Sequence, residues 1–157
     1  MREEGIQHDI LVIEDNPSDQ RLIEEAFTES RSELGIQTVG DGDVAVDLLR
    51  RLTSTGSSLL PDVVLLDLHL SGRNGDAVLD TVRTELGLEC LPVIVLSCSD
   101  NAEDVALCYE AGANAYLKKP DGFTDWVSIA ETVEHLWVEH ARQPNICPPD
   151  RSPEVGI

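Results

Sequence analysis

The sequence predicts an α/β fold in which five parallel strands form a doubly wound sheet with helices on both faces. Two observations support this class. Five short apolar runs alternate with five amphipathic stretches of helical period, which is the pattern of a βα unit repeated five times. The runs at 63–66 and 93–96 are apolar without alternation, as expected for strands that are covered on both faces.

The elements can be placed in order along the chain. Strands are expected near residues 9–14, 36–40, 62–67, 92–97 and 114–118. Apolar residues that share one face define four of the helices: Leu22, Ile23, Ala26 and Phe27 in the first; Val44, Leu48, Leu49 and Leu52 in the second; Val78, Leu79, Val82 and Leu86 in the third; Trp126, Ala130, Val133 and Trp137 in the fifth. The fourth helix is expected over about 101–111.

Local signals agree with two of these boundaries. Asn16 places a capping side chain directly before Pro17, which suits the first turn of a helix. Gly112 follows the fourth helix, where a left-handed residue is expected to end it.

The length of 157 residues suits one domain with a full-sized core. We expect this domain over residues 8–140, after a short N-terminal extension over 1–7. Four of the eight prolines follow residue 143, where no periodic apolar pattern is present, so we expect a disordered tail over 141–157. We expect no room for a second catalytic or DNA-binding domain.

The composition is strongly acidic. The chain has 30 Asp and Glu residues against 11 Lys and Arg residues, and its formal charge of −19 opposes contact with nucleic acid or with an anionic membrane. Proteins and cations are therefore the expected partners. The acidic excess, with very few lysines, resembles the composition of halophilic proteins, in which concentrated salt screens self-repulsion.

The sequence also indicates where in the cell the protein is expected. No apolar run approaches the roughly 20 residues that a bilayer-spanning helix needs, and the N-terminus lacks a signal-peptide pattern. The four cysteines show no metal-binding spacing and are expected to be reduced: Cys90, Cys98, Cys108 and Cys147. We therefore expect a cytoplasmic protein.

Polar residues stand where the apolar runs end: Asp15, Asp67, Ser97 and Lys119. Because the carboxyl ends of parallel strands meet at one edge of a sheet, these side chains should converge there. With Glu14, this edge gathers three carboxylates. At about 5 Å and an effective dielectric of about 20, each like-charge pair costs about 3 kcal/mol, so a cation must offset the repulsion. Magnesium suits such ligands; the simpler alternative is that Glu14 or Asp15 merely caps the first helix.

Asp67 has the surroundings of a nucleophile. It follows a buried apolar run and precedes a loop rich in turn residues that opens the next helix. A cation beside it, and the lysine from the fifth strand, would make its carboxylate a nucleophile toward phosphorus, and the product would be an acyl phosphate.

Together these residues resemble the receiver domain of two-component response regulators, over about residues 8–140. In that family an acidic pair ends the first strand, the phosphorylated aspartate ends the third, Ser or Thr ends the fourth, and Lys-Pro with a cis peptide follows the fifth. The matching residues here are Glu14–Asp15, Asp67, Ser97 and Lys119–Pro120. The resemblance implies the flavodoxin-like (CheY-like) sheet order 2-1-3-4-5.

The resemblance also implies roles for the site residues. Asp67 would be the phosphoacceptor. Asp15, Asp67 and the main-chain carbonyl of His69 would hold Mg²⁺, while Glu14 would act mainly through a coordinated water. Lys119 would bind phosphoryl oxygens. Ser97 and Tyr116 would form a switch in which one side chain swings toward the phosphoryl group and the other turns into the space it leaves.

The function implied is that of a phosphorelay signalling protein. A sensor histidine kinase would donate the phosphoryl group, and the change would reach a separate downstream protein through the face of the fourth helix, fifth strand and fifth helix. The same face carries many receiver dimers, so a homodimer is a further option. The stretch from Glu14 to Asp19 is similar to that of stand-alone receivers found with phytochrome-like sensor kinases. Such a protein is not an enzyme, apart from its own phosphorylation and dephosphorylation.

Two other functions stay open at this point. One is a Mg-dependent phosphohydrolase with Asp67 as its nucleophile; such enzymes usually place a second Asp two residues further on, where this chain has His69. The other is a degenerate receiver that serves only as a binding module. The complete set of Glu14, Asp15, Asp67 and Lys119 argues against the second.

Overall fold

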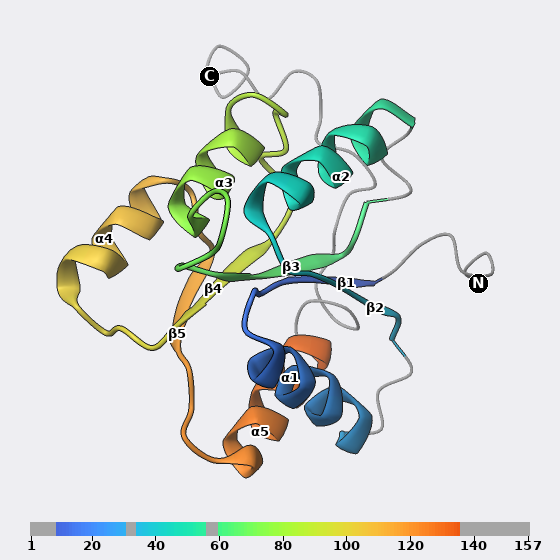
Figure 1. The fold of residues 1–157 in the computed structure, drawn as a ribbon, viewed down its shortest axis with the longest axis vertical. Coiled ribbons are helices and arrows are strands. Elements are labelled where there is room, and N and C mark those ends of the chain that lie inside the picture. Colours follow the sequence, from blue (N-terminus) through green and yellow to red (C-terminus); the bar gives the residue numbers. More distant parts are fainter. Residues whose placement is uncertain (1–8, 31–33, 56–59, 136–157) are drawn as a thin grey trace, which may run out of the picture.

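The computed structural model describes residues 9–30, 34–55 and 60–135, which form a three-layer α/β fold (Figure 1). The strands are β1 (Ile10–Ile13), β2 (Ile36–Val39), β3 (Val63–Asp67), β4 (Val93–Ser97) and β5 (Ala115–Lys118). They form one parallel sheet in the order β2-β1-β3-β4-β5, which confirms the predicted fold class and strand order.

Five helices connect and cover the strands. Their bounds are α1 (Pro17–Glu29), α2 (Gly42–Thr55), α3 (Gly75–Arg83), α4 (Ala102–Glu110) and α5 (Phe123–Val133). α1 and α5 lie on one face of the sheet, and α2, α3 and α4 lie on the other (Figure 1). None of these helices combines the length and the apolar character needed to cross a membrane within the described residues.

The two predicted boundary signals are confirmed. The Asn16 side chain accepts hydrogen bonds from the amides of Ser18 and Asp19, at 2.8 and 3.1 Å, and so caps α1. Gly112 has φ of 110°, a left-handed conformation that lets the chain turn from α4 into β5.

Side chains of the central strands alternate between two separate cores. Leu11 and Ile13 of β1 point toward α2 and α3, whereas Ile10 and Val12 point toward α1 and α5. β1, β3 and β4 are buried along their whole length because helices cover both of their faces. The three central strands thus support the carboxyl edge with packed side chains on both faces.

The predicted apolar faces are mostly buried, with two differences. Leu86, expected in the third helix, lies beyond the end of α3 at Arg83, and one residue on α2 is exposed. Val44 is 53% exposed, while Ala45, Val46 and Leu49 are buried. Successive helical residues are about 100° apart, so the face that contains Ala45 and Leu49 turns Val44 toward solvent. The prediction chose Val44 for the buried face, but that face carries Ala45, Val46 and Leu49.

Some expectations fall outside the described residues. They are the N-terminal extension over 1–7, the tail over 141–157, both ends of the domain expected over 8–140, Trp137 and Cys147. Cys98 and Cys108 are free thiols as expected. Cys90 is disulfide-bonded, so the expectation of reduced cysteines is wrong for that residue.

Gly75 allows the close packing that fixes the end of β3. A Cβ atom at this position would lie 2.4 Å from the carbonyl oxygen of Asp67 and 2.8 Å from the Cα atom of Leu68. The Gly75 amide also donates to the Leu68 carbonyl, at 2.8 Å. α3 therefore starts directly against the backbone that carries Asp67, and only glycine leaves room for it.

We expect Gly75→Ala to lower the free energy of unfolding by about 2 to 3 kcal/mol, because the main chain at Asp67 must move to admit the methyl group. Urea unfolding would measure the loss. Gly122→Ala is the matched control, since its Cβ would meet no atom within 4 Å. Gly122 is the N-cap of α5, so its change should cost at most about 1 kcal/mol. Equal losses for the two variants would contradict the packing argument.

Candidate functional site

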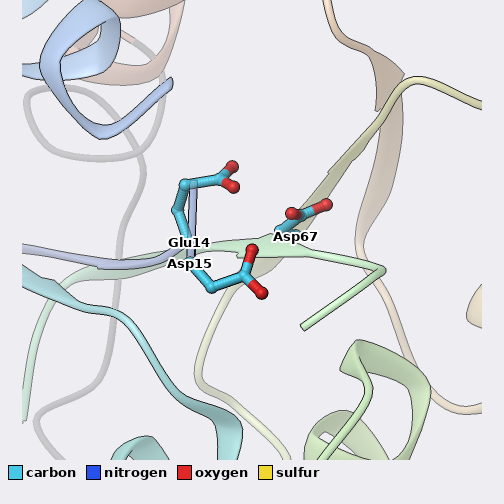
Figure 2. A group of neighbouring side chains, drawn as sticks. All are labelled: Glu14, Asp15 and Asp67. Atoms are coloured by element: carbon cyan, nitrogen blue, oxygen red, sulfur yellow. The ribbon is translucent and has the colours of Figure 1, made fainter. Parts of the chain in front are cut away.

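Three carboxylates meet at the carboxyl edge of the sheet. Glu14 and Asp15 follow β1, and Asp67 ends β3, whose residue Leu66 pairs with Ile13. One oxygen of each carboxylate lies within 4.8 Å of an oxygen of the other two, which confirms the expected proximity. Figure 2 shows the three side chains turned toward a common space. Glu14 and Asp67 are only 1% and 6% exposed, so water screens their charges weakly.

This cluster fits a hard divalent cation. All of its donors are carboxylate oxygens, which Mg²⁺ prefers over nitrogen or sulfur. Glu14 Oε1 is buried, and among the described residues its close polar neighbour is the Lys119 ammonium, at 2.9 Å. An oxygen in that position can accept a further ligand or a metal-bound water.

Lys119 places one positive charge among these carboxylates. Its Nζ lies 2.8 Å from Asp19 Oδ2, 2.9 Å from Glu14 Oε1 and 3.4 Å from Asp67 Oδ2. The Lys119 amide donates to the Ser97 carbonyl at 2.7 Å, so strand pairing continues past β5 and holds the residue in register. The side chain is 8% exposed.

Lys118 points away from the site, as the period of two in a strand predicts. Its side chain is 59% exposed and its Nζ lies 3.5 Å from Asp100 Oδ2. Of the two adjacent lysines, only Lys119 therefore belongs to the carboxylate cluster.

The electrostatics follow from burial and proximity. Burial is the main cause that raises the pKa of Glu14 to about 7, and the Asp67 carboxylate adds to the shift. Burial acts to lower the pKa of Lys119, but its contacts with Asp19 and Glu14 outweigh burial, and the pKa is raised. Lys119 therefore keeps its charge at neutral pH. The Glu14 carboxyl group, in contrast, is partly protonated near pH 7.

The loop between β3 and α3 supplies donors to the same edge. Asp15 Oδ2 accepts from both the amide and the hydroxyl of Ser71, at 2.9 and 3.0 Å. The His69 amide donates to Asp67 Oδ1 at 3.3 Å, while the His69 side chain is exposed. Main-chain amides and the Ser71 hydroxyl thus orient the Asp15 and Asp67 carboxylates.

Ser97 and Tyr116 are both linked to Ser99, in the loop after β4. The fully buried Ser97 accepts at Oγ from the Ser99 amide, at 3.1 Å. The Tyr116 hydroxyl donates to the Ser99 carbonyl at 2.7 Å. Ser99 Oγ in turn donates to Asp104 Oδ2 on α4, at 2.7 Å. One residue therefore connects both expected switch side chains with α4.

The cis peptide expected between Lys119 and Pro120 is not present. No cis peptide bond occurs within the described residues, so this bond is trans and the expectation is wrong for this structure. The trans form of an X–Pro bond is favoured by about 0.5 to 1 kcal/mol, and here it already brings Lys119 into contact with Glu14 and Asp67.

Two residues at this edge were missed by sequence reasoning, Asp19 and Ser71. Asp19 stands in the first turn of α1, where an acidic residue is explained by the helix dipole alone. Nothing local indicates that its carboxylate meets Lys119, one hundred positions later. The Ser71 contact with Asp15 depends on the path of the β3–α3 loop, which no periodicity predicts.

The doubly wound sheet, its buried carboxylates and the lysine beside them define a receiver-type signalling domain. Residues 10–131 match the family described as the response regulator receiver domain, and the chain belongs to this family. Receiver domains bind Mg²⁺ at the acidic pocket that this chain carries in Glu14, Asp15 and Asp67. The family is one of signalling domains.

Several relatives cover nearly the whole chain. Response regulator Rcp1 from Synechocystis sp. is 32% identical over 135 residues, which are 86% of this chain and 92% of the relative. A crystal structure of the Mn²⁺-bound form of Rcp1 has a TM-score of 0.74 and 31% identity, with 87% of this chain and 99% of that chain covered. A structure of the phosphorylated cyanobacterial phytochrome response regulator RcpA has a TM-score of 0.75 and 31% identity, with 88% and 99% covered.

We expect Asp15→Asn to weaken Mg²⁺ binding at least about tenfold, because one charged oxygen ligand is lost while the shape is kept. The asparagine oxygen can still accept from Ser71, so the loop should stay in place. Thermal unfolding at increasing Mg²⁺ would measure affinity, since a bound ligand raises the unfolding temperature. Asp47→Asn, an exposed carboxylate on α2 that pairs with Arg50, is the control and should leave the titration unchanged. Equal Mg²⁺ titrations for Asp15→Asn and wild type would remove Asp15 from the ligand set.

Proposed function

We propose that Asp67 accepts a phosphoryl group from a sensor histidine kinase in the presence of Mg²⁺, and that this modification switches a protein-binding face. The observation that carries the proposal is the position of the Asp67 carboxylate. It ends a buried strand, lies within 4.8 Å of oxygens of Glu14 and Asp15, and has the Lys119 ammonium at 3.4 Å. A nucleophile with a fixed cation on one side and clustered oxygen ligands on the other suits phosphoryl transfer.

The chemical step needs little from the protein beyond positioning and charge. An oxygen of the Asp67 carboxylate forms the new bond to phosphorus, and the donor's leaving atom departs with the electron pair of the old bond. The product is an acyl phosphate on Asp67; a histidine donor leaves as neutral imidazole when its other ring nitrogen carries a proton. Lys119 offers N–H donors to the phosphoryl oxygens and offsets their charge.

The metal residues are assigned in the same proposal. Asp15, Asp67 and the main-chain carbonyl of His69 would hold Mg²⁺, and Glu14 would act mainly through a coordinated water. When bound, Mg²⁺ neutralises charge on the carboxylates and on the phosphoryl oxygens. The carboxylate cluster and the buried oxygen of Glu14 support this assignment.

The switch would pass through Ser97 and Tyr116. In this structure Ser97 Oγ accepts a hydrogen bond from the Ser99 amide. That bond would break if Ser97 Oγ turned to the phosphoryl group. Tyr116, which donates to the Ser99 carbonyl, would respond to that change. Both contacts lie beside α4, so their rearrangement would alter the surface of α4, β5 and α5.

That surface suits a reversible protein contact. α4 buries one residue, Cys108, and leaves Leu107 and Tyr109 44% and 48% exposed. Apolar side chains beside the acidic residues of the same helix resemble the mixed composition of transient interfaces. A downstream protein, or a second copy of the chain, would bind there.

The two other functions have less support. A phosphohydrolase would need an acid or base two residues after Asp67, but the His69 side chain is exposed and only its amide reaches Asp67. A purely binding role does not require the buried carboxyl groups of Glu14 and Asp67. Their mutual repulsion lowers the stability of the fold, so a chemical role explains them better.

Incubation with Mg²⁺ and acetyl phosphate, followed by intact-protein mass, tests the proposal. Wild type should gain one phosphoryl group, because its nucleophile and its counter-charges are in place. Asp67→Asn should gain none, since the amide is not a nucleophile toward phosphorus. Equal modification of the two proteins would show that Asp67 is not the acceptor.

Lys119→Arg is expected to stay folded and still accept some phosphate, yet to lose most of the phosphorylation-dependent change in tyrosine fluorescence. Arginine keeps the charge but replaces a compact ammonium with a larger planar group, which cannot occupy the same space between Glu14 and Asp67. Fluorescence spectra with and without acetyl phosphate would measure the change.

Lys118→Arg is the matched control, because this neighbouring lysine is exposed and pairs only with Asp100 among the ion pairs of the described residues. Its spectra should be those of wild type. The assigned role of Lys119 would be contradicted by a wild-type fluorescence change in Lys119→Arg. Loss of the fluorescence change in Lys118→Arg alone would contradict it as well.

A further inference from the structure

The Lys119 ammonium is shared unequally among its neighbours. Its Nζ lies 2.8 Å from Asp19 Oδ2, to which it donates a hydrogen bond, and 2.9 Å from Glu14 Oε1. The Asp67 oxygen, which would carry the phosphoryl group, is the most distant of the three carboxylate oxygens, at 3.4 Å. In this structure the ammonium therefore lies closer to Asp19 on α1 and to Glu14 after β1 than to the nucleophile.

We propose that Asp19 is a positioning residue that holds back Lys119 and so limits how firmly Lys119 binds the phosphoryl group on Asp67. This inference rests on the proposed function of Asp67 and concerns the regulation of the same site. Asp19 itself need not touch the phosphoryl group. It acts by competing for the one ammonium that the site contains within the described residues.

The backbone of α1 keeps Asp19 in place for this competition. Its amide donates to the Asn16 side chain at 3.1 Å, which fixes the first turn of the helix. A helix cap and a favourable helix dipole account for an acidic residue here, but neither needs a lysine partner. The Asp19 side chain is 22% exposed and Lys119 is 8% exposed, so the contact between them is only partly screened.

Charge counting supports the direction of the effect. Three carboxylates, those of Glu14, Asp19 and Asp67, lie around one ammonium, and Asp15 adds a fourth negative charge beside Glu14 and Asp67. Phosphorylation replaces the single carboxylate charge of Asp67 with about two negative charges on three phosphoryl oxygens, so it draws the ammonium toward these oxygens. Every N–H that Lys119 gives to Asp19 is one that the phosphoryl oxygens lack.

The test measures how tightly the full chain binds beryllium fluoride, a stable analogue of the phosphoryl group, at saturating Mg²⁺ by intrinsic fluorescence. Asp19→Asn keeps the shape but removes the charge, and it should bind about threefold to tenfold more tightly than wild type. Asp19→Ser is a second neutral variant that also suits a helix N-terminus. Asp19→Glu keeps a carboxylate and should restore the wild-type affinity.

Asp100→Asn is the matched control for loss of one negative charge, because Asp100 pairs with Lys118 as Asp19 pairs with Lys119. Its affinity should change less than about twofold. The decisive comparison is Asp19→Asn in a Lys119→Met background. There its effect should shrink to that of Asp100→Asn, because no ammonium is left to release.

The outcomes separate this inference from the proposed function. If Asp19→Asn and Asp19→Ser bind no more tightly than wild type, or if the gain persists without Lys119, Asp19 does not act through Lys119 and the inference is wrong. If wild type binds no beryllium fluoride and takes no phosphoryl group on Asp67, the proposed function fails as well. A gain that depends on Lys119 and disappears in Asp19→Glu supports the inference.

Discussion

The contact of one ammonium with several buried carboxylates governs the functional edge of this protein. Lys119 Nζ lies within 3.4 Å of oxygens of Glu14, Asp19 and Asp67, which would otherwise face one another with little screening. The parallel sheet imposes this proximity, because its strand ends meet at one edge whatever their side chains are. The domain therefore carries a local cost to its stability, as is common where function requires like charges to be close.

The same edge is connected to the rest of the domain by a few hydrogen bonds. Ser99 accepts from Tyr116, donates its amide to Ser97 and donates its hydroxyl to Asp104 on α4. Because these bonds meet at one residue, Ser97 cannot turn without removing a partner from that loop. The arrangement explains how a change confined to the end of β4 can reach a helix that is not part of the site.

The sequence predicted the fold and most of the site because both depend on periodicity. Buried apolar runs marked the strands, and the residues that end them, among them Asp67 and Ser97, had to converge. The contact of Asp19 with Lys119 could not be predicted, because it joins the first turn of α1 to the residue after β5 through side-chain geometry that no repeat encodes. The cis peptide at Pro120 was taken from the family pattern and is absent from the described residues. The salt-loving character stays a prediction.

The division of the apolar interior into two cores affects how the sequence of such a domain can evolve. Tyr116 packs into the core beneath α2, α3 and α4, whereas the neighbouring Leu117 packs beneath α1 and α5. Since the sheet separates the two cores, a substitution in one can be compensated by its own neighbours without a matching change in the other. The two faces of the domain can therefore diverge at different rates, so that one side adapts to a new partner while the other keeps its packing.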